Sequence, residues 1–181
     1  EPDAGQSHAV GGGCGGAPGA VLAWRHSGDA WLPGAVNAML DCFAADPGLG
    51  LVEGDTVVVD ADSRVIRCDR RAGPSRNWMR YGYMRIHQPS TFFRRDVYER
   101  VGGVDRSLHC VMDTALWYRI LSSTRAKRLR RYVGVHRSPD EPTGPADAGS
   151  ATYISARRRT QSKCPQDCAH PVRHRLGSVA R

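Results

Sequence analysis

One stretch near the start of the chain decides the fold: Ala20-Val-Leu-Ala-Trp-Arg-His-Ser-Gly-Asp-Ala-Trp-Leu-Pro-Gly34. Its first five residues form a short apolar run, which is typical of a buried strand. The polar residues 26–29 that follow predict a turn. Pro33 then suits the first turn of a helix, where its missing N–H is not needed. A strand, a turn and a helix in this order are one unit of an α/β layered domain.

The rest of the chain repeats this alternation as far as about residue 144. Val36, Met39, Leu40 and Phe43 fall at helical spacing, and Asp46-Pro-Gly48 ends that helix. The pattern predicts helices at residues 33–45, 78–83, 95–101 and 112–121, and strands at 51–60, 65–66, 90–93 and 130–135. We therefore expect a central mixed sheet flanked by helices. The glycine-rich residues 1–18 are the exception, because each glycine weakens a helix by about 1 kcal/mol relative to alanine.

Composition narrows the class of protein further. The 181 residues are 40% hydrophobic and 24% charged, which is ordinary for a soluble domain with a core. The net charge of +8 favours anionic partners such as nucleotide diphosphates, nucleic acid or acidic lipid headgroups. Six scattered cysteines and no basic-then-apolar leader predict reduced thiols in a cytoplasmic protein. A start at Glu1 rather than Met suggests a fragment or a processed product.

Several stretches, taken in order, resemble family 2 glycosyltransferases with the GT-A fold. The family's patterns E-P-D-x-G-Q-S-D-A-I, I-L-A-W-L-N-S-D-D-x-Y-L-P-G and D-L-G-L-V-Y-G-D are similar to residues 1–10, 21–34 and 49–55. Two further matches are Gln88-Pro-Ser-Thr-Phe-Phe-Arg-Arg95, which precedes Val101-Gly-Gly-Val-Asp105, and Met112-Asp-Thr-Ala-Leu-Trp-Tyr-Arg119. Each motif is weak alone, and their order and spacing make the match specific.

The resemblance implies a partial GT-A domain over residues 1–144, with the family's N-terminal nucleotide-binding portion missing. It also implies inverting transfer of a sugar from a nucleotide-sugar donor to a hydroxyl of a glycan, lipid or protein, for example in polysaccharide biosynthesis. Family members act in the cytoplasm or at the inner membrane face, so association with a membrane surface is one partner expectation. We expect this chain alone to be impaired, since part of the donor site is absent.

A divalent cation, Mg²⁺ or Mn²⁺, is the cofactor that the resemblance implies. Asp29 follows the apolar strand where the family holds the metal, and a cation there neutralises the leaving diphosphate. His136 matches a family histidine that completes the metal site or contacts the diphosphate. The alternatives are a carboxylate in the first turn of a helix for Asp29 and a structural role for His136. Gly28 stands where the family has a second Asp, and Gly11 where it has Asn.

Asp113 matches the family's catalytic base, which takes the proton of the acceptor hydroxyl. The alternative is a carboxylate that only caps its helix. The resemblance assigns Asp3, Gln6 and Ser7 to the donor side, and Gln88, Trp117 and Arg119 to donor or acceptor binding. Gln88 carries both donor and acceptor groups. Trp117 could instead belong to the core, as a tryptophan on a helix commonly does.

Residues 145–181 are basic, poor in large apolar groups and predicted to be disordered. A rival reading is a nucleic-acid-binding module built on Arg157-Arg-Arg159 and the arginines at 125, 128, 130 and 131, although nucleic acid is not the expected partner. A second rival is a zinc site at Cys164, Cys168, His170 and His174, whose spacing does not match a known finger. A third is a folded remnant without catalytic activity.

Overall fold

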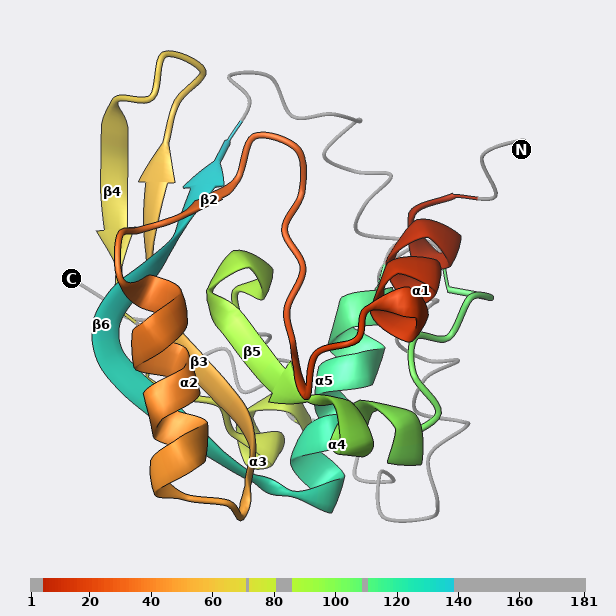
Figure 1. Ribbon diagram of the computed structural model, residues 1–181. Coiled ribbons are helices and arrows are strands. Elements are labelled where there is room, and N and C mark those ends of the chain that lie inside the picture. The colour runs from red at the N-terminus through yellow and green to blue at the C-terminus, as the bar shows by residue number, and fades with distance from the viewer. Residues whose placement is uncertain (1–4, 71, 81–85, 109–110, 139–181) are drawn as a thin grey trace, which may run out of the picture.

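The computed structural model describes residues 5–70, 72–80, 86–108 and 111–138. Helices and strands alternate along these residues, as the sequence predicts (Figure 1). In chain order the elements are α1 Gln6–Gly16, β1 Val21–Leu22, β2 Ala30–Trp31, α2 Ala35–Ala45, β3 Leu49–Val59, β4 Val65–Asp69, α3 Arg76–Arg80, the 3-10 turn η1 Gln88–Ser90, β5 Thr91–Arg94, α4 Arg95–Arg100, α5 Met112–Ser123 and β6 Arg125–Arg137.

A single mixed sheet organises these elements. Its strand order is β1-β5-β3-β6-β2, and β4 pairs with the second half of β3. The pair β3 and β6 is parallel, whereas the other pairs are antiparallel. Strand β3 lies in the middle and is buried along almost its whole length. The predicted α/β class with a mixed sheet and flanking helices is confirmed.

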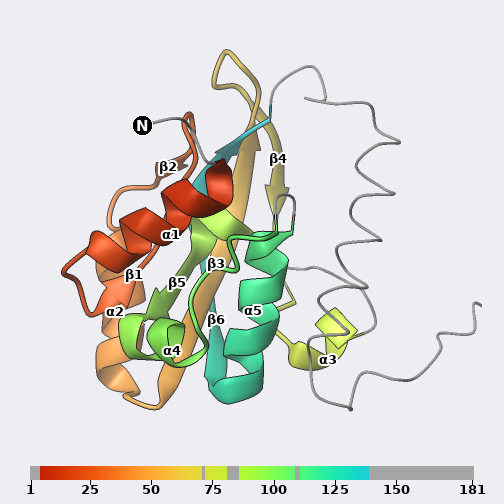
Figure 2. The same ribbon diagram turned by 90° about the vertical axis from the view of Figure 1, so that its right-hand side faces the viewer.

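The two faces of the sheet carry separate cores because neighbouring residues of a strand point to opposite sides. Leu51 and Phe93 face α5, α4 and α1, and pack with Leu116 and Trp117. Val52 and Phe92 face α2 and pack with its Met39 and Phe43. Figure 2 shows α2 and α5 on opposite sides of the sheet.

Helix α1 differs from the expectation drawn from its glycines. Its buried residues, Ser7, Gly11 and Cys14, fall on one face, and the Ser7 hydroxyl donates a hydrogen bond to the carbonyl of Leu108. Tertiary packing of this face therefore outweighs the low helix propensity of the glycines. Strand β6 is also longer than the predicted residues 130–135, because its first half pairs with β3 as well.

Some predictions fall outside the described residues. These are Asp3, the tail 145–181, its arginine cluster and its candidate zinc ligands. None of the helices in the described part of the chain is long and apolar enough to cross a membrane.

Candidate functional site

Three of the predicted site residues, Asp29, His136 and Gln88, lie around the loop that joins β1 to β2. This loop, residues 23–29, runs past the end of β6 and past η1. Asp29 closes its turn by donating its N–H to the carbonyl of His26, and Arg25 donates to the carbonyl of Asp29. Ala30 then pairs with Val135, so the residue before it lies beside His136. The register of β2 and β6 thus fixes where Asp29 stands.

Asp29 and His136 contact each other directly. Oδ1 of Asp29 lies 3.1 Å from Nδ1 of His136 and accepts the backbone N–H of Arg137 at the same distance. The Asp29 side chain is 2% exposed and that of His136 is 40% exposed. Burial disfavours the charged carboxylate, but the hydrogen bonds from His136 and Arg137 outweigh burial and lower the pKa of Asp29. Asp29 is therefore an ionised carboxylate beside a solvent-facing imidazole.

These two residues fit a divalent cation in one respect. The second oxygen of Asp29, Oδ2, is buried and has no hydrogen-bond partner among the described residues. His136 donates its Nδ1–H to the other oxygen of this carboxylate, so its Nε2 faces away from Asp29. Among the described residues, no three His, Cys, Asp or Glu side chains form a metal-binding group. Asp29 Oδ2 would therefore share an ion with substrate oxygens and water, while His136 Nε2 is free to contact the diphosphate.

At position 28, where the family has a further acid, the backbone has a conformation that favours glycine. Gly28 has φ +93°, a region that residues with a Cβ rarely adopt. A Cβ at this position would also lie 3.2 Å from Cδ of Arg137. The arginine side chain thus lies in the space into which a side chain at position 28 would extend.

Gln88 lies on the other side of the loop. Its amide nitrogen donates to the carbonyl of Trp24, while its Oε1 is buried without a partner among the described residues. The turn that holds Gln88 is anchored to the sheet through Ser90, whose hydroxyl contacts the Thr56 hydroxyl at 2.8 Å and accepts the N–H of Gly134 at 3.0 Å. The unpartnered oxygen leaves Gln88 with an acceptor for a ligand hydroxyl.

Asp113 lies in the first turn of α5, one residue after its start. Its Oδ1 accepts the N–H of Thr114 at 2.6 Å, and Val111 is the N-cap residue. Burial raises the pKa of Asp113, and the Thr114 hydrogen bonds and the charge of His26 offset this only in part. A carboxylate with a raised pKa is a better proton acceptor, so this environment suits a general base.

Two of the predicted ligand-binding residues make contacts within the scaffold. Trp117 is fully buried and stacks on Trp24 with ring centroids 5.0 Å apart and planes at 9°, so the prediction that it stacks on a sugar is corrected. The guanidinium of Arg119 donates to the carbonyls of Ala115, Val101 and Gly103. It therefore holds the end of α4 against α5, and its predicted role in ligand binding stays a prediction.

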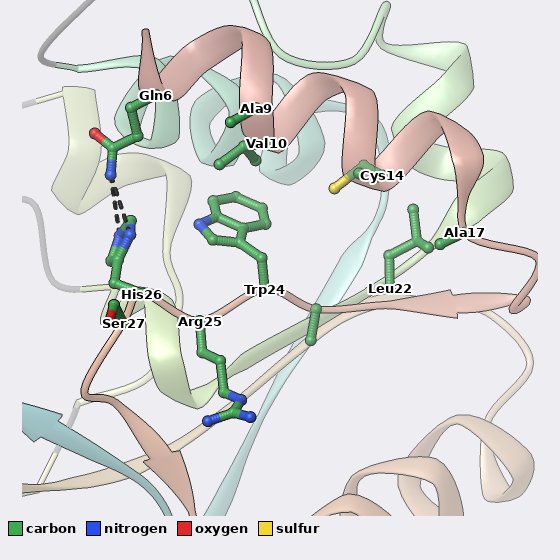
Figure 3. A pocket seen from close by; sticks show the side chains of 12 residues that line it. Gln6, Ala9, Val10, Cys14, Ala17, Leu22, Trp24, Arg25, His26 and Ser27 are labelled. Atoms are coloured by element: carbon green, nitrogen blue, oxygen red, sulfur yellow. Dashed lines mark hydrogen bonds between the residues drawn. The ribbon is translucent and has the colours of Figure 1, made fainter. Parts of the chain in front are cut away.

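On the predicted donor side, Gln6 and Ser7 separate. Ser7 is buried and bonded to Leu108, whereas Gln6 is exposed and its amide lies 3.1 Å from Nδ1 of His26 (Figure 3). Gln6 and His26 stand at one end of a pocket of about 480 Å³ between α1 and residues 22–27. The apolar wall of this pocket is made by Val10, Cys14, Leu22 and Trp24.

The comparisons with known proteins bear on the fold. No protein-family model matches the sequence, and no curated protein matches it. The structure is similar to the crystal structure of S. aureus TarS residues 1–349, a glycosyltransferase, with a TM-score of 0.60 and 10% sequence identity. The chain shares the fold of a glycosyltransferase. The match covers 87% of this chain and 44% of the TarS chain, so the chain spans less than half the length of that neighbour.

The fold brings together residues that lie far apart in the sequence, and it adds others. Asp29, His136 and Gln88 lie around the loop of residues 23–29, whereas Asp113 lies in the first turn of α5. Sequence reasoning missed Arg137, which follows His136 directly and contacts Gly28, and also Glu53, which is fully buried and accepts the N–H of His87. An acidic residue in a valine-rich strand was the available signal for Glu53. No sequence pattern singled out Arg137, since the chain contains many arginines.

Proposed function

We propose that this chain is part of an inverting, cation-assisted glycosyltransferase that moves a sugar from a nucleotide-sugar donor to an acceptor hydroxyl. The contact between Asp29 and His136 carries the proposal, since the two residues were predicted separately as metal ligands and lie 3.1 Å apart. The shared fold of TarS supports the reaction class. Inversion and membership of family 2 rest on the sequence motifs.

On the donor side, Asp29 Oδ2 would hold Mg²⁺ or Mn²⁺, and the ion would supply positive charge for the leaving diphosphate, which His136 Nε2 would contact. The bond between Oδ1 and Nδ1 fixes the imidazole ring, so that Nε2 faces away from the carboxylate. Gln88 Oε1 offers an acceptor for a hydroxyl of the bound sugar.

On the acceptor side, Asp113 would act as the base. The acceptor oxygen forms its bond to the anomeric carbon while the bond from that carbon to the diphosphate breaks. The hydroxyl proton passes to the carboxylate of Asp113, and the diphosphate leaves with the electron pair of the broken bond. The environment that raises the pKa of Asp113 strengthens it as a proton acceptor.

The donor and acceptor are proposed only as classes. The likeness to TarS supports a nucleotide-sugar donor and an acceptor in general, and a hydroxyl of a glycan, lipid or protein as the acceptor rests on the sequence motifs. The cytoplasm, where nucleotide sugars are made, is the proposed place of the reaction, and the inner membrane face is the proposed surface for peripheral association. An inactive remnant is the competing outcome.

The test is a transfer assay with a panel of radiolabelled nucleotide sugars and Mn²⁺, run with the wild type and with Asp113→Asn. We expect weak donor-dependent transfer, in keeping with the impairment expected from the sequence, and we expect Asp113→Asn to reduce it by about 100-fold or more. The matched control is Asp96→Asn, because Asp96 is also in the first turn of a helix but pairs only with exposed Arg100. Donor binding should survive Asp113→Asn. A chain that binds no nucleoside diphosphate, with or without Mn²⁺, would be the remnant.

A further inference from the structure

The side chain of Arg137 ties two turns together beside the candidate site. Its Nε donates to the carbonyl of Gly28 at 3.3 Å, and its Nη1 donates to the carbonyls of Asp60 at 2.9 Å and Ala61 at 2.6 Å. Its Nη2 donates to the Ser63 hydroxyl at 2.9 Å. One guanidinium thus joins the turn between β3 and β4 to the loop that carries Asp29.

Both turns hold unusual backbone where they meet this arginine. Gly28 has φ +93°, and Ser63, with φ 66°, is the one residue other than glycine with a positive φ in the described part of the chain. Glycine adopts such backbone freely, whereas at Ser63 it is costly and persists because the surroundings hold it in place. The turn at Ser63 is further closed by the bond from its N–H to the Asp60 carbonyl, and by the Asp60 carboxylate, which accepts the N–H of Arg64.

The main chain of Arg137 acts on the site directly. Its N–H donates to Oδ1 of Asp29 at 3.1 Å, the oxygen that also contacts His136. The side chain therefore holds the residue before Asp29 while the main chain holds its carboxylate. A change in the side chain leaves the N–H in place, so the two contributions can be separated by mutation.

We propose that Arg137 is the positioning residue of the cation site, and that its guanidinium sets the placement of Asp29 by fixing Gly28 against the Asp60–Ser63 turn. This proposal rests on the proposed function, because it takes Asp29, held in place by His136, as the ligand of the ion. It explains why position 28 carries glycine rather than a second acid. A planar fork with several donors suits three carbonyls and a hydroxyl, and the ammonium of lysine does not reproduce it.

The experiment measures Mn²⁺ binding by electron paramagnetic resonance, and the ring signals of His136 by NMR in the metal-free protein. We expect Arg137→Gln to weaken Mn²⁺ binding by roughly 10-fold or more, the usual scale for residues that orient metal ligands. Arg137→Lys should recover little of the loss, and Ser63→Ala should cause a smaller loss because it removes one bond. Arg100→Gln is the control, since Arg100 makes an exposed ion pair on α4.

The outcomes distinguish a failure of the cation site from a failure of the positioning role of Arg137. If the wild type binds Mn²⁺ and Arg137→Gln binds it equally well, the positioning role is wrong while the cation site stands. If the wild type binds no Mn²⁺, the cation site fails, and the metal-free His136 signals then test the arginine alone. Those signals should shift in Arg137→Gln and Ser63→Ala but not in Arg100→Gln. Unshifted signals in a variant that remains folded by circular dichroism overturn the inference.

Discussion

Asp29 Oδ1 and His136 Nδ1 lie 3.1 Å apart although 107 residues separate them in the chain. The pairing of Ala30 with Val135 produces this contact, since it sets the loop after β1 against the end of β6. The carboxylate also accepts the N–H of Arg137, so one oxygen has two partners while the other has none among the described residues. Several expected outcomes follow from this arrangement and from its surroundings.

Replacing Asp29 by Asn should destabilise the protein in a pH-dependent way. The pKa of Asp29 is lowered in the folded state, so its ionised form stabilises the fold above the ordinary carboxyl pKa of about 3.9. That contribution is lost as pH falls through the lowered pKa. We expect the wild type to exceed Asp29→Asn in free energy of unfolding by about 1 kcal/mol at pH 7. Urea titrations at pH 7 and pH 3 check this, and a difference that persists unchanged at pH 3 contradicts it.

Asp113→Asn should have the opposite effect on stability. Burial raises the pKa of Asp113, so the ionised carboxylate opposes folding at neutral pH. A raised pKa gives a contribution that is fully present at low pH and is lost as pH rises through the folded pKa. The variant should therefore unfold at a slightly higher temperature than the wild type at pH 7, while turnover is lost. Calorimetry at pH 7 checks this. If Asp113→Asn unfolds at the same temperature as the wild type or at a lower one, the ionised Asp113 does not oppose folding and the prediction is wrong.

Trp117 should matter for stability rather than for ligand binding. It is fully buried between Trp24 and Phe93, with ring centroids 5.0 and 5.4 Å away. Trp117→Ala should lower the free energy of unfolding by about 3–5 kcal/mol. Trp117→Phe should cost much less and leave donor and acceptor affinities unchanged. A sugar-stacking role predicts instead that Trp117→Phe weakens acceptor binding in a protein of normal stability.

Restoring an acid at position 28 should weaken the fold instead of completing a metal site. Gly28→Asp places a Cβ 3.2 Å from Cδ of Arg137 and on backbone with φ +93°. The left-handed backbone alone costs roughly 1–2 kcal/mol for a residue with a Cβ. Chemical unfolding of Gly28→Asp and of Gly12→Asp, where a Cβ meets nothing within 4 Å, gives the comparison. Equal stability of the two variants would disprove the strain at position 28.

The open glycines of α1 should tolerate alanine and gain from it. A Cβ at Gly12 or Gly13 meets nothing within 4 Å outside the helix, and both lie in the interior of α1. Gly12→Ala and Gly13→Ala should each stabilise the protein by about 0.5–1 kcal/mol, because alanine restricts the unfolded chain and favours the helix. Gly11→Ala should gain less, since its Cβ would lie 3.3 Å from the Arg106 side chain. Thermal unfolding of the three variants tests the order.

Local signals predicted most of the elements. Pro33 and the spacing of Met39 and Phe43 gave α2, and the valine-rich residues 51–60 gave most of β3. Strand β2 was missed because two residues, Ala30 and Trp31, become a strand only when β6 lies beside them. Helix α1 gave conflicting signals, since its glycines oppose a helix and the buried face of Ser7, Gly11 and Cys14 favours one.

The residues of the candidate site were likewise predicted only in part from the sequence. Motif spacing singled out Asp29, Asp113, Gln88 and His136, since a motif keeps residue types at fixed positions along the chain. It also singled out Trp117 and Arg119, because the same motif contains residues that pack and residues that bind. Burial separates the two kinds, and burial depends on the neighbours that the fold supplies.

By itself, the sequence determined the alternation of strands and helices and the carboxylates and histidine available for chemistry, because hydrophobic periodicity and turn residues act locally. Only the tertiary structure decided that Asp29 meets His136, that Arg137 lies over Gly28, and that Trp117 is core. These contacts join segments about 100 residues apart, and strand register and helix packing bring them together. No local pattern records that register, since it is chosen by the burial of both faces of the sheet at once.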